Sequence, residues 1–375
     1  MFDTVKPTAI YFYQYLPPWR VDVFNEIGKY YNLIIVFTNA DSEGFTYNRQ
    51  FLLSKLTNVH TIFLKSGVSI GSRKVRFGIH KILKRIKPEY VFSHEYSPTS
   101  ILAAIYKKHF GYRYVITTSD NVDMAKGVGA IKSKFRKFVL NHSNGIIVYS
   151  KNVEKFYKQT FPNLKVGICP NIQNPVSLLS YREEFTTIIR SYKQKFGIQG
   201  NDNIMLYVGR LVEVKGLDLL VKAFHKASLP NYKLVIVGSG VLETTLKQAV
   251  SSYGLTNKVI FAGQYSGAEL YAWYDMANFF ILPSRYEPFG AVVNEALVFG
   301  CPVVASKYIG ALDFINETNG IIFNPIDETY FINALLEANK KYSKPITIRK
   351  DLMVCRFSDF VSVFQPDNWN DYDHR

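Results

Sequence analysis

The segment from Phe279 to Pro302 constrains the fold more than any other part of the chain. It begins with four consecutive apolar residues, 279–282, a pattern typical of a buried parallel strand. Pro288 stands where a helix can begin, because its missing N–H is one that the first turn does not use. Apolar residues then recur at three- and four-residue spacing until Gly300 and Pro302 end the pattern. The segment therefore predicts a strand, a tight loop and a helix, which is the repeating unit of an α/β fold.

The loop and the start of this predicted helix carry groups that suit a polar, anionic ligand. Glu287 lies in the loop, and Glu295 lies about two turns along the helix. We expect the amides near Phe289, Gly290 and Ala291 to be unpaired and to carry the positive end of the helix dipole. Two carboxylates beside free N–H donors suit a ligand with several hydroxyl groups and a negative charge, and a nucleotide sugar is such a ligand.

The two glutamates, separated by seven residues within EPFG and NEALVFGCPVVAS, resemble the nucleotide-sugar motif of retaining GT-B glycosyltransferases. The resemblance is to the large bacterial family four, the glycosyl transferases group 1, and it is strongest over residues 203–327. It implies an α/β fold in which two Rossmann-like domains have parallel sheets facing each other across a cleft. We expect an acceptor-side domain over 1–180, a nucleotide-sugar-binding domain over 181–345, and a return segment with the tail over 346–375.

A second motif, GRLVEVKG, resembles the phosphate-binding element of the same enzymes and contains Gly209, Arg210 and Lys215. A departing nucleoside diphosphate gains negative charge as the glycosidic bond breaks, and two fixed cations can stabilise it without a metal ion. Gly238, in a GSG turn after the next predicted strand, is a further candidate for the donor site, although the turn also fits a plain tight bend.

The resemblance also implies a role for each glutamate and for both cations. Glu295 is expected to bind the ribose hydroxyls, and Glu287 a hydroxyl of the donor sugar. Arg210 and Lys215 are expected to neutralise the leaving diphosphate.

Candidate acceptor-side residues follow the predicted strands of the first half. In the PPWR loop, Trp19 offers a flat face for a sugar ring and Arg20 a fork for a phosphate or carboxylate; the alternative is a rigid turn with a solvated arginine. His94, Glu95 and Asp120 stand at the carboxyl ends of two later strands, where open α/β sheets build ligand sites. Asp120 is the ionisable group nearest to the place where relatives carry an acceptor-facing residue, so we treat it as a catalytic candidate. The alternative for His94 and Glu95 is a pair with structural hydrogen bonds at a helix entry.

The net charge of +15 comes from the first half of the chain, which favours an anionic partner for residues 1–180. Two stretches, 71–87 and 126–140, alternate basic and apolar residues, so that a helix would separate a cationic face from an apolar one. Such helices can lie on anionic membranes. The alternative is a pair of core-facing helices with solvated basic faces.

Composition favours a cytoplasmic protein, at most peripheral on the inner face of the membrane. The three cysteines are too scattered for a disulfide framework, and no metal-ligand spacing is present. The N-terminus lacks a signal-peptide layout, and no apolar run reaches the ~20 residues that span a bilayer. The DYD triplet at 371–373 matches a metal-binding pattern of another transferase fold, but we interpret it as chance on a polar tail.

We therefore expect a retaining, metal-independent glycosyltransferase without a cofactor. Its substrates would be a UDP- or GDP-linked sugar and a glycan acceptor, lipid-linked or part of a cell-surface polysaccharide such as lipopolysaccharide. One alternative is an inactive relative that only binds a nucleotide sugar. The other is a basic nucleic-acid-binding protein, although no helix–turn–helix or aromatic RNA-binding signature is present.

Overall fold

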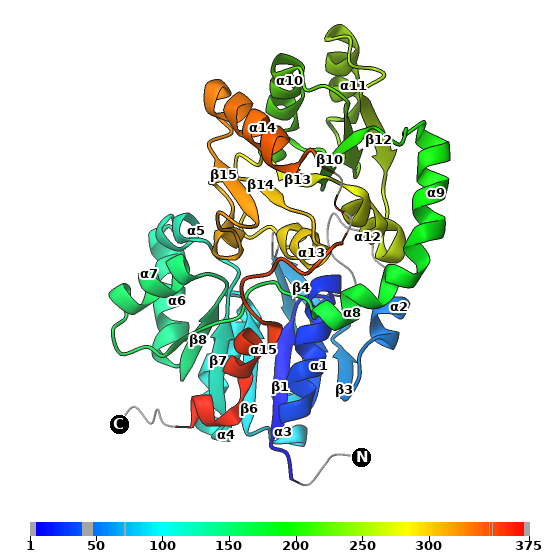
Figure 1. Cartoon of the computed structure of the whole chain (residues 1–375). Coiled ribbons are helices and arrows are strands. Elements are labelled where there is room, and N and C mark those ends of the chain that lie inside the picture. Colours follow the sequence, from blue (N-terminus) through cyan, green and yellow to red (C-terminus); the bar gives the residue numbers. More distant parts are fainter. Residues whose placement is uncertain (1–4, 40–47, 71–72, 345, 347, 371–375) are drawn as a thin grey trace. The chain divides into compact units, whose positions relative to one another are not determined.

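Two parallel β-sheets organise the chain, each in its own α/β unit (Figure 1). The computed structural model describes residues 5–39, 48–70, 73–344, 346 and 348–370. The first unit consists of residues 1–173 together with 357–375, and the second of 174–356. The division thus falls earlier than the expected 180/181, and the end of the chain belongs to the first unit. The expected cleft between the units stays a prediction, and the DYD triplet at 371–373 lies outside the described residues.

The first unit has a seven-stranded parallel sheet in the order β3-β2-β1-β6-β7-β8-β9. Its strands are β1 (Thr8–Tyr13), β2 (Asn32–Phe37), β3 (Val59–Phe63), β6 (Tyr90–His94), β7 (Arg113–Thr117), β8 (Gly145–Val148) and β9 (Val166–Ile168). Its main helices are α1 (Val21–Tyr30), α2 (Arg49–Ser54), α3 (Ile79–Ile86), α4 (Pro98–Phe110), α5 (Val122–Lys126), α6 (Ala130–Asn141) and α7 (Lys151–Thr160). The central strands are continuous apolar runs because helices cover both faces of the sheet.

Side chains of β1 point alternately to the two faces of the sheet and pack into a different core on each face. Ile10 and Phe12 belong to the core that the sheet shares with α3, α4, α6 and α7. Tyr11 points to the opposite face, where its ring packs on Phe24 of α1 at 5.5 Å. Side chains of successive strand residues point to opposite faces, so one apolar strand supplies both cores.

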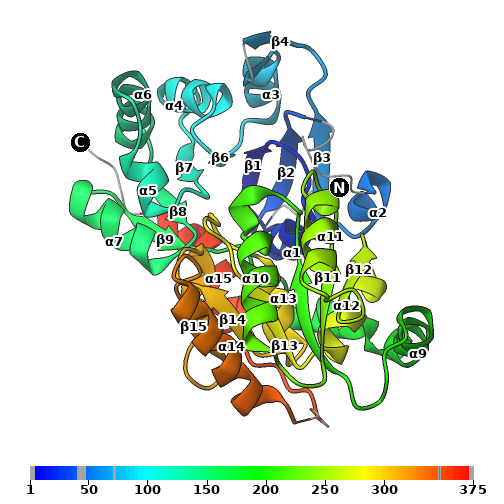
Figure 2. The same cartoon turned by 90° about the horizontal axis from the view of Figure 1, so that it is seen from above.

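The end of the chain belongs to the first unit from residue 357 onward, and not from the expected residue 346. There α15 (Phe357–Val361) is followed by two 3₁₀ turns, Ser362–Phe364 and Pro366–Trp369. The ring of Phe364 packs 5.5 Å from that of Phe92 on the sheet, and Trp369 is 1% exposed. The indole covers Gly145, where an added Cβ would lie 2.4 Å from it. In Figure 2 this segment lies beside β9. The return segment is therefore part of the core of the first unit.

The basic stretch 71–87 is not one amphipathic helix, so this prediction was wrong. A hairpin of β4 (Gly67–Ile70) and β5 (Arg73–Arg76) precedes α3, and residues 71 and 72 lie outside the described part. In α3 the apolar residues Ile79, Ile82 and Leu83 are buried, and the lysines are exposed. This helix is thus a core-facing one with a solvated basic face, the alternative stated above.

The second unit has a six-stranded parallel sheet in the order β12-β11-β10-β13-β14-β15. Its strands are β10 (Asn203–Val208), β11 (Tyr232–Val237), β12 (Val259–Gly263), β13 (Phe279–Leu282), β14 (Val303–Ser306) and β15 (Gly320–Phe323). Its helices are α8 (Pro175–Leu179), α9 (Phe185–Phe196), α10 (Leu217–Ala227), α11 (Glu243–Ser252), α12 (Gly267–Met276), α13 (Val292–Val298) and α14 (Glu328–Tyr342). In Figure 1, α10, α11 and α14 lie above the strands, and α12 and α13 lie below them. Within the described residues, no helix is both long and apolar enough to cross a membrane.

The strand at 279–282 is confirmed, but the helix after it begins at Val292 and not at Pro288. The preceding loop is extended because it pairs with the segment after β14. The amide of Glu287 donates to the carbonyl of Tyr308 at 3.1 Å, and the amide of Ala311 donates to the carbonyl of Phe289 at 2.8 Å. A segment held in this way cannot also form the first turn of a helix.

We predict that Trp369→Ala destabilises the first unit by about 3–5 kcal/mol, since it removes a fully buried indole and leaves a cavity on the sheet. Chemical denaturation with a probe of the first unit measures this loss. Tyr330→Ala, which truncates an aromatic side chain that is 65% exposed on α14, is the matched control and should change the free energy of unfolding by less than about 0.5 kcal/mol. Equal effects of the two substitutions would contradict the role given to the return segment.

Candidate functional site

In the second unit, the loops that follow β10, β11 and β13 are packed closely at the carboxyl edge of the sheet. A Cβ added at Gly238 would lie 1.9 Å from the carbonyl oxygen of Gly209, and one added at Gly216 would lie 2.3 Å from that of Pro283. Only glycine allows such contacts between backbones. The two motifs that the sequence analysis selected are therefore brought together by backbone packing, at the edge where open α/β sheets bind ligands.

An ion pair joins the two motifs directly. Lys215 ends a short 3₁₀ turn, Glu213–Lys215, and its Nζ donates a hydrogen bond to Oε2 of Glu287. The two side chains are 13% and 14% exposed, so the pair is largely shielded but open to the surface. The structure thus places one predicted cation against one predicted carboxylate, although the residues lie 72 positions apart in the chain.

Tyr207 supports the loop that carries Arg210. Its hydroxyl donates a 2.9 Å hydrogen bond to the carbonyl oxygen of Arg210 and so supports the loop after β10. Burial raises the pKa of Tyr207, the nearby charge of Glu287 raises it further, and the charge of Arg210 opposes this rise. The phenol therefore lies within electrostatic range of both charged side chains. Arg210 itself is exposed.

Glu295 is held separately on α13, where it is 9% exposed. The hydroxyl of Tyr274, a fully buried residue of α12, donates to Oε2 of Glu295 at 3.0 Å. Burial raises the pKa of Tyr274 well above its usual value, and the carboxylate charge adds to this rise, so the phenol stays protonated and donates. Tyr207 and Tyr274 were missed as site residues, because a tyrosine in an apolar strand or helix gives no signal beyond that of the core.

The predicted ring of amides has a different geometry from the one expected. Gly290 adopts φ 94°, and Ala291 is the N-cap of α13, which has only seven residues. The side chain of Phe289 is 5% exposed and packs edge-on against Phe314 at 5.8 Å. A role for Phe289, Gly290 and Ala291 in donor binding stays a prediction that concerns their backbone.

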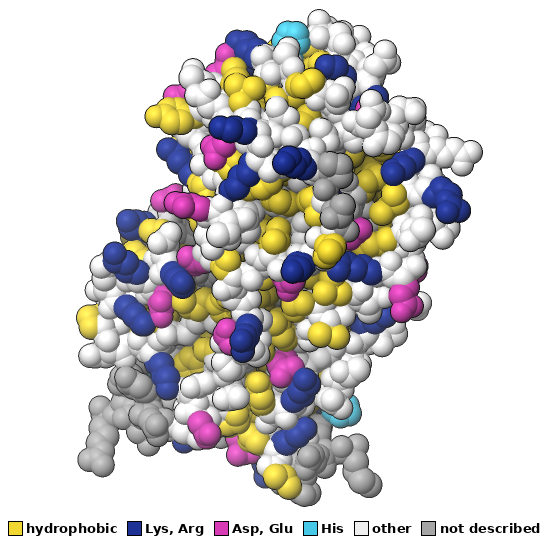
Figure 3. All heavy atoms as spheres, in the orientation of Figure 1, with side chains coloured by type: hydrophobic (Ala, Val, Ile, Leu, Met, Phe, Trp, Pro, Cys, Tyr) yellow, Lys and Arg dark blue, Asp and Glu magenta, His cyan; other side chains and the backbone are white. Residues whose placement is uncertain are grey.

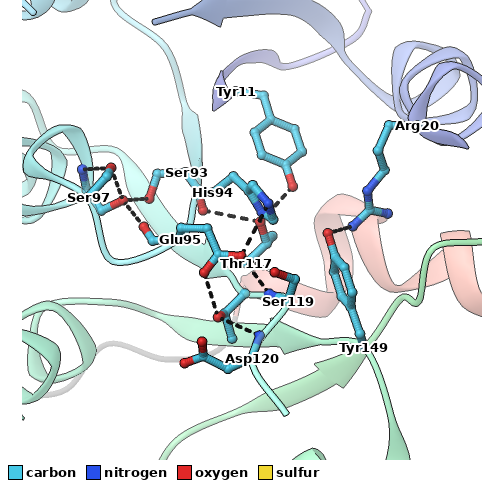
Figure 4. A network of polar contacts seen from close by, with 12 residues as sticks. Tyr11, Arg20, Ser93, His94, Glu95, Ser97, Thr117, Ser119, Asp120 and Tyr149 are labelled. Atoms are coloured by element: carbon cyan, nitrogen blue, oxygen red, sulfur yellow. Dashed lines mark hydrogen bonds and ion pairs between the residues drawn. The ribbon is translucent and has the colours of Figure 1, made fainter. Parts of the chain in front are cut away.

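The first unit holds a second polar cluster at the carboxyl ends of β6 and β7 (Figure 4). Glu95 lies at its centre with φ 62°, a conformation that non-glycine residues adopt only when their surroundings hold them there. Its carboxylate accepts hydrogen bonds from Oγ1 of Thr118 at 3.0 Å, and from the amide and Oγ of Ser119 at 2.8 and 2.5 Å. These are the structural hydrogen bonds that the alternative interpretation of Glu95 expected, and its contact with an acceptor stays a prediction.

His94 supports Glu95 as a neutral imidazole. Its ring stacks on that of Tyr13 at 4.2 Å, and Nε2 lies 3.3 Å from Oε1 of Glu95. Burial lowers the pKa of His94 to about 4; Glu95 opposes this change and the charge of Arg20 adds to it. Nδ1 lies 3.1 Å from the hydroxyl of Thr117. We assign the Nε2–H tautomer from the carboxylate of Glu95, which can only accept.

Of the two interpretations of Arg20 made from the sequence, the solvated arginine was wrong, and the guanidinium expected to act as a fork for a phosphate or carboxylate has protein partners in this structure. Arg20 is 1% exposed. Its Nη2 donates to the hydroxyl of Tyr149 at 2.5 Å, its Nη1 donates to the carbonyl of Pro170 at 3.3 Å, and the guanidinium lies over the Tyr149 ring at 4.7 Å. Arg20 therefore ties the PPWR loop to the ends of β8 and β9. The neighbouring Trp19 is half-buried, and its contact with a sugar stays a prediction.

Asp120 is buried and paired with a cation. It is 4% exposed, and its Oδ2 lies 2.6 Å from Nη2 of Arg136 on α6. Burial raises the pKa of Asp120 to about 6, Glu95 adds to the rise, and Arg136 opposes it. In this structure Asp120 connects α6 to the end of β7, and its proposed catalytic role is untested.

The fold of the whole chain is that of the GT-B proteins. The crystal structure of the Anabaena protein HepE in complex with UDP and glucose superposes with a TM-score of 0.70 at 16% identity, over 96% of this chain and 98% of HepE. Residues 188–350 match the family of glycosyl transferases group 1, so the chain carries a domain of this family.

Two curated relatives are similar over part of their length. An uncharacterized glycosyltransferase of Methanocaldococcus jannaschii is 35% identical over 187 residues, which are 48% of this chain and 47% of that protein. The lipopolysaccharide 1,2-N-acetylglucosaminetransferase of Salmonella typhimurium is 28% identical over 239 residues, 60% of each chain. The chain thus matches between about half and three-fifths of the length of these relatives.

We predict that His94 makes the first unit less stable as the pH falls from 6.5 to 4. The unfolded chain binds a proton on His94 below pH 6.5, whereas the folded protein does not until about pH 4, so the loss grows to at most about 3 kcal/mol. His94→Gln should remove this component, and His225→Gln, at an exposed histidine, should not. Asp120 has the opposite pH dependence over about pH 4–6, but it is present in all three proteins. Denaturation curves at pH 7, 5.5 and 4 measure the free energy of unfolding of the unmodified chain and the two variants. If all three proteins lost the same stability between pH 7 and pH 4, the role given to His94 would be contradicted.

Proposed function

We propose that the protein transfers a sugar from a nucleotide-sugar donor to a hydroxyl group of a glycan acceptor, with retention of the anomeric configuration. The observation that carries the proposal is the Lys215–Glu287 ion pair, with Arg210 on the same loop as Lys215, at the carboxyl edge of the sheet in a group 1 glycosyltransferase domain. A diphosphate and the hydroxyl groups of a sugar need this combination of cations and a carboxylate in one place.

The donor is held by the second unit. Glu295, oriented by Tyr274, accepts hydrogen bonds from the ribose hydroxyls, and Glu287 accepts one from a hydroxyl of the transferred sugar. Arg210 and Lys215 bind the diphosphate, and Gly209 and Gly238 allow the two loops at this edge of the sheet to pack together. HepE was solved with UDP and glucose, which supports a UDP-linked donor; a GDP-linked one is the alternative.

Binding of the diphosphate changes the partner of Lys215. In the structure Lys215 is paired with Glu287, so its ammonium group is already positioned and largely shielded from water. When the diphosphate binds, Lys215 turns to it and Glu287 accepts from the sugar hydroxyl instead. Each charge-assisted hydrogen bond of this kind contributes about 1.5–3 kcal/mol, and it strengthens as the leaving group gains charge.

The transfer itself needs no protein nucleophile. The bond between the anomeric carbon and the diphosphate oxygen breaks, the acceptor oxygen attacks from the same face, and its proton passes to the leaving phosphate. Arg210 and Lys215 stabilise the departing charge without a metal ion or a cofactor. Glu287 lies in a loop and is paired with Lys215, whereas Glu295 lies on α13 and accepts from Tyr274. Because their surroundings differ in this way, we do not assign them as the acid and base of a hydrolase.

The acceptor belongs to the first unit, where the carboxylate of Glu95, positioned by His94, and the half-buried Trp19 are the candidate contacts. We propose a lipid-linked or surface glycan, supported by the excess of basic residues in this unit and by the similarity to the Salmonella lipopolysaccharide enzyme. No observation favours an inactive relative or a nucleic-acid-binding protein, because the charged side chains of both donor motifs are present.

We predict that Glu287→Gln lowers the rate of sugar transfer at least a hundredfold while nucleoside diphosphate affinity changes less than fivefold, since the amide no longer accepts as an anion in the transition state. The assay is product formation from a panel of UDP- and GDP-sugars, with binding measured by calorimetry. Glu213→Gln makes the same chemical change at an exposed position on the adjacent turn and serves as the control. Normal turnover by Glu287→Gln would remove the central assignment.

A further inference from the structure

We propose that the first two turns of α6, with the end of α5, form a docking surface for an anionic lipid bilayer. This α6 surface consists of Met124, Ile131, Lys132, Lys134, Phe135 and Lys137. It goes beyond the proposed sugar transfer, and it can be tested without any knowledge of the sugar or the acceptor.

Large apolar side chains are exposed on this surface. Ile131 is 73% exposed, Phe135 48% and Met124 40%. Ile131 and Phe135 lie one turn apart and therefore on the same side of the helix. The next turn of the helix is different, because Val139 and Leu140 are buried in the core of the first unit. The helix is thus fixed by its C-terminal half, and its N-terminal half presents an apolar stripe to the outside.

Lysines stand on both sides of the stripe. At about 100° per residue, Lys132 follows Ile131 on one side and Lys134 lies on the other. Both are exposed, as is Lys137, and residues 130–141 contain no acidic side chain. Lysines beside an apolar stripe can keep their ammonium groups at the lipid headgroups while the apolar side chains enter the bilayer. In Figure 3, Lys and Arg side chains lie interleaved with apolar ones on the face turned to the viewer, whereas α6 lies behind α7 in that view.

The fourth cation of the helix is used internally and fixes the orientation of the surface. Arg136 pairs with the buried Asp120 at 2.6 Å, and its guanidinium lies 4.6 Å from the centre of the Tyr96 ring. The hydroxyl of Tyr96 is in turn 2.9 Å from that of Tyr157 on α7. Because Arg136 faces inward, the lysines and the apolar stripe are held outward before any partner binds.

The combination of charge and exposed apolar area favours a bilayer over other partners. A nucleic acid would use the lysines and could stack a base on Phe135, but it would gain nothing from the more exposed Ile131 or from Met124. A second copy of this surface would place like charges against each other. An anionic bilayer matches both features, since its headgroups attract the lysines and its acyl region accepts the apolar side chains.

The chain contains a matched control in α3. This helix exposes Lys81 and Lys84 in the same unit, but its apolar residues are buried against the sheet. A charge change on α3 therefore alters the net charge of the protein by the same amount as one on α6 and leaves the apolar stripe untouched.

The test is co-sedimentation of the full chain with vesicles of phosphatidylcholine containing 30% phosphatidylglycerol, and with vesicles of phosphatidylcholine alone. We expect binding to the anionic vesicles only. Lys132→Gln/Lys134→Gln should lower the partition coefficient about 25-fold, since each lysine near the surface contributes about fivefold. Ile131→Ser/Phe135→Ser should lower it at least tenfold, and Lys81→Gln/Lys84→Gln less than threefold.

The outcomes separate the α6 surface from general charge and from donor binding. The proposal is overturned if both α6 variants bind like the unmodified chain, if the α3 variant loses as much as the lysine variant of α6, or if RNA binds in place of vesicles. Concentration-dependent dimerisation that disappears in the Ile131→Ser/Phe135→Ser variant, with no vesicle binding, would assign the surface to a second copy instead. Nucleoside diphosphate affinity, measured on the same variants, should stay unchanged, so failure here leaves the proposed function untouched.

Discussion

The ion pair between Lys215 and Glu287 depends on the order of strands in the second sheet. The pair can form only because β10 and β13 are neighbours, although two strands and three helices separate them in the chain. Both strands are parallel, so the loops that carry the two residues leave the sheet at the same edge. The contact of Gly216 with the backbone of Pro283 then brings the loops close enough for the side chains to meet. The cation and the carboxylate neutralise each other, so the protein can hold both groups largely shielded at this edge.

Much of the fold could be predicted because the buried strands of parallel sheets are short apolar runs between turns. The strand at 279–282 was predicted at its observed bounds. The sequence-based predictions were wrong where tertiary contacts determine the local structure. The loop before α13 pairs with the segment after β14, so Pro288 does not begin the helix although its sequence context allows this. The strand β3 was missed because a histidine and a threonine interrupt its apolar residues, and it lies at the edge of the sheet.

The candidate site could be predicted in its charged residues but not in the groups that hold them. Glu287 and Lys215 belong to motifs with a recognisable spacing, whereas Tyr207 and Tyr274 are single residues in apolar elements. Arg20 shows the opposite case. An arginine in a proline-containing loop such as PPWR is commonly exposed. Only the contacts of Arg20 with Tyr149 and Pro170 show that its side chain is buried.

The most direct measurement of the central claim compares the binding of a nucleoside diphosphate with that of its nucleoside, in the unmodified chain and in Lys215→Met. If Lys215 exchanges Glu287 for the diphosphate, the substitution removes one charge-assisted hydrogen bond, and diphosphate affinity should fall about 10- to 150-fold. Affinity for the nucleoside, which depends on Glu295, should stay within about twofold. Equal losses for both ligands, or a Lys215→Met variant that binds the diphosphate as tightly as the unmodified chain, would contradict the account.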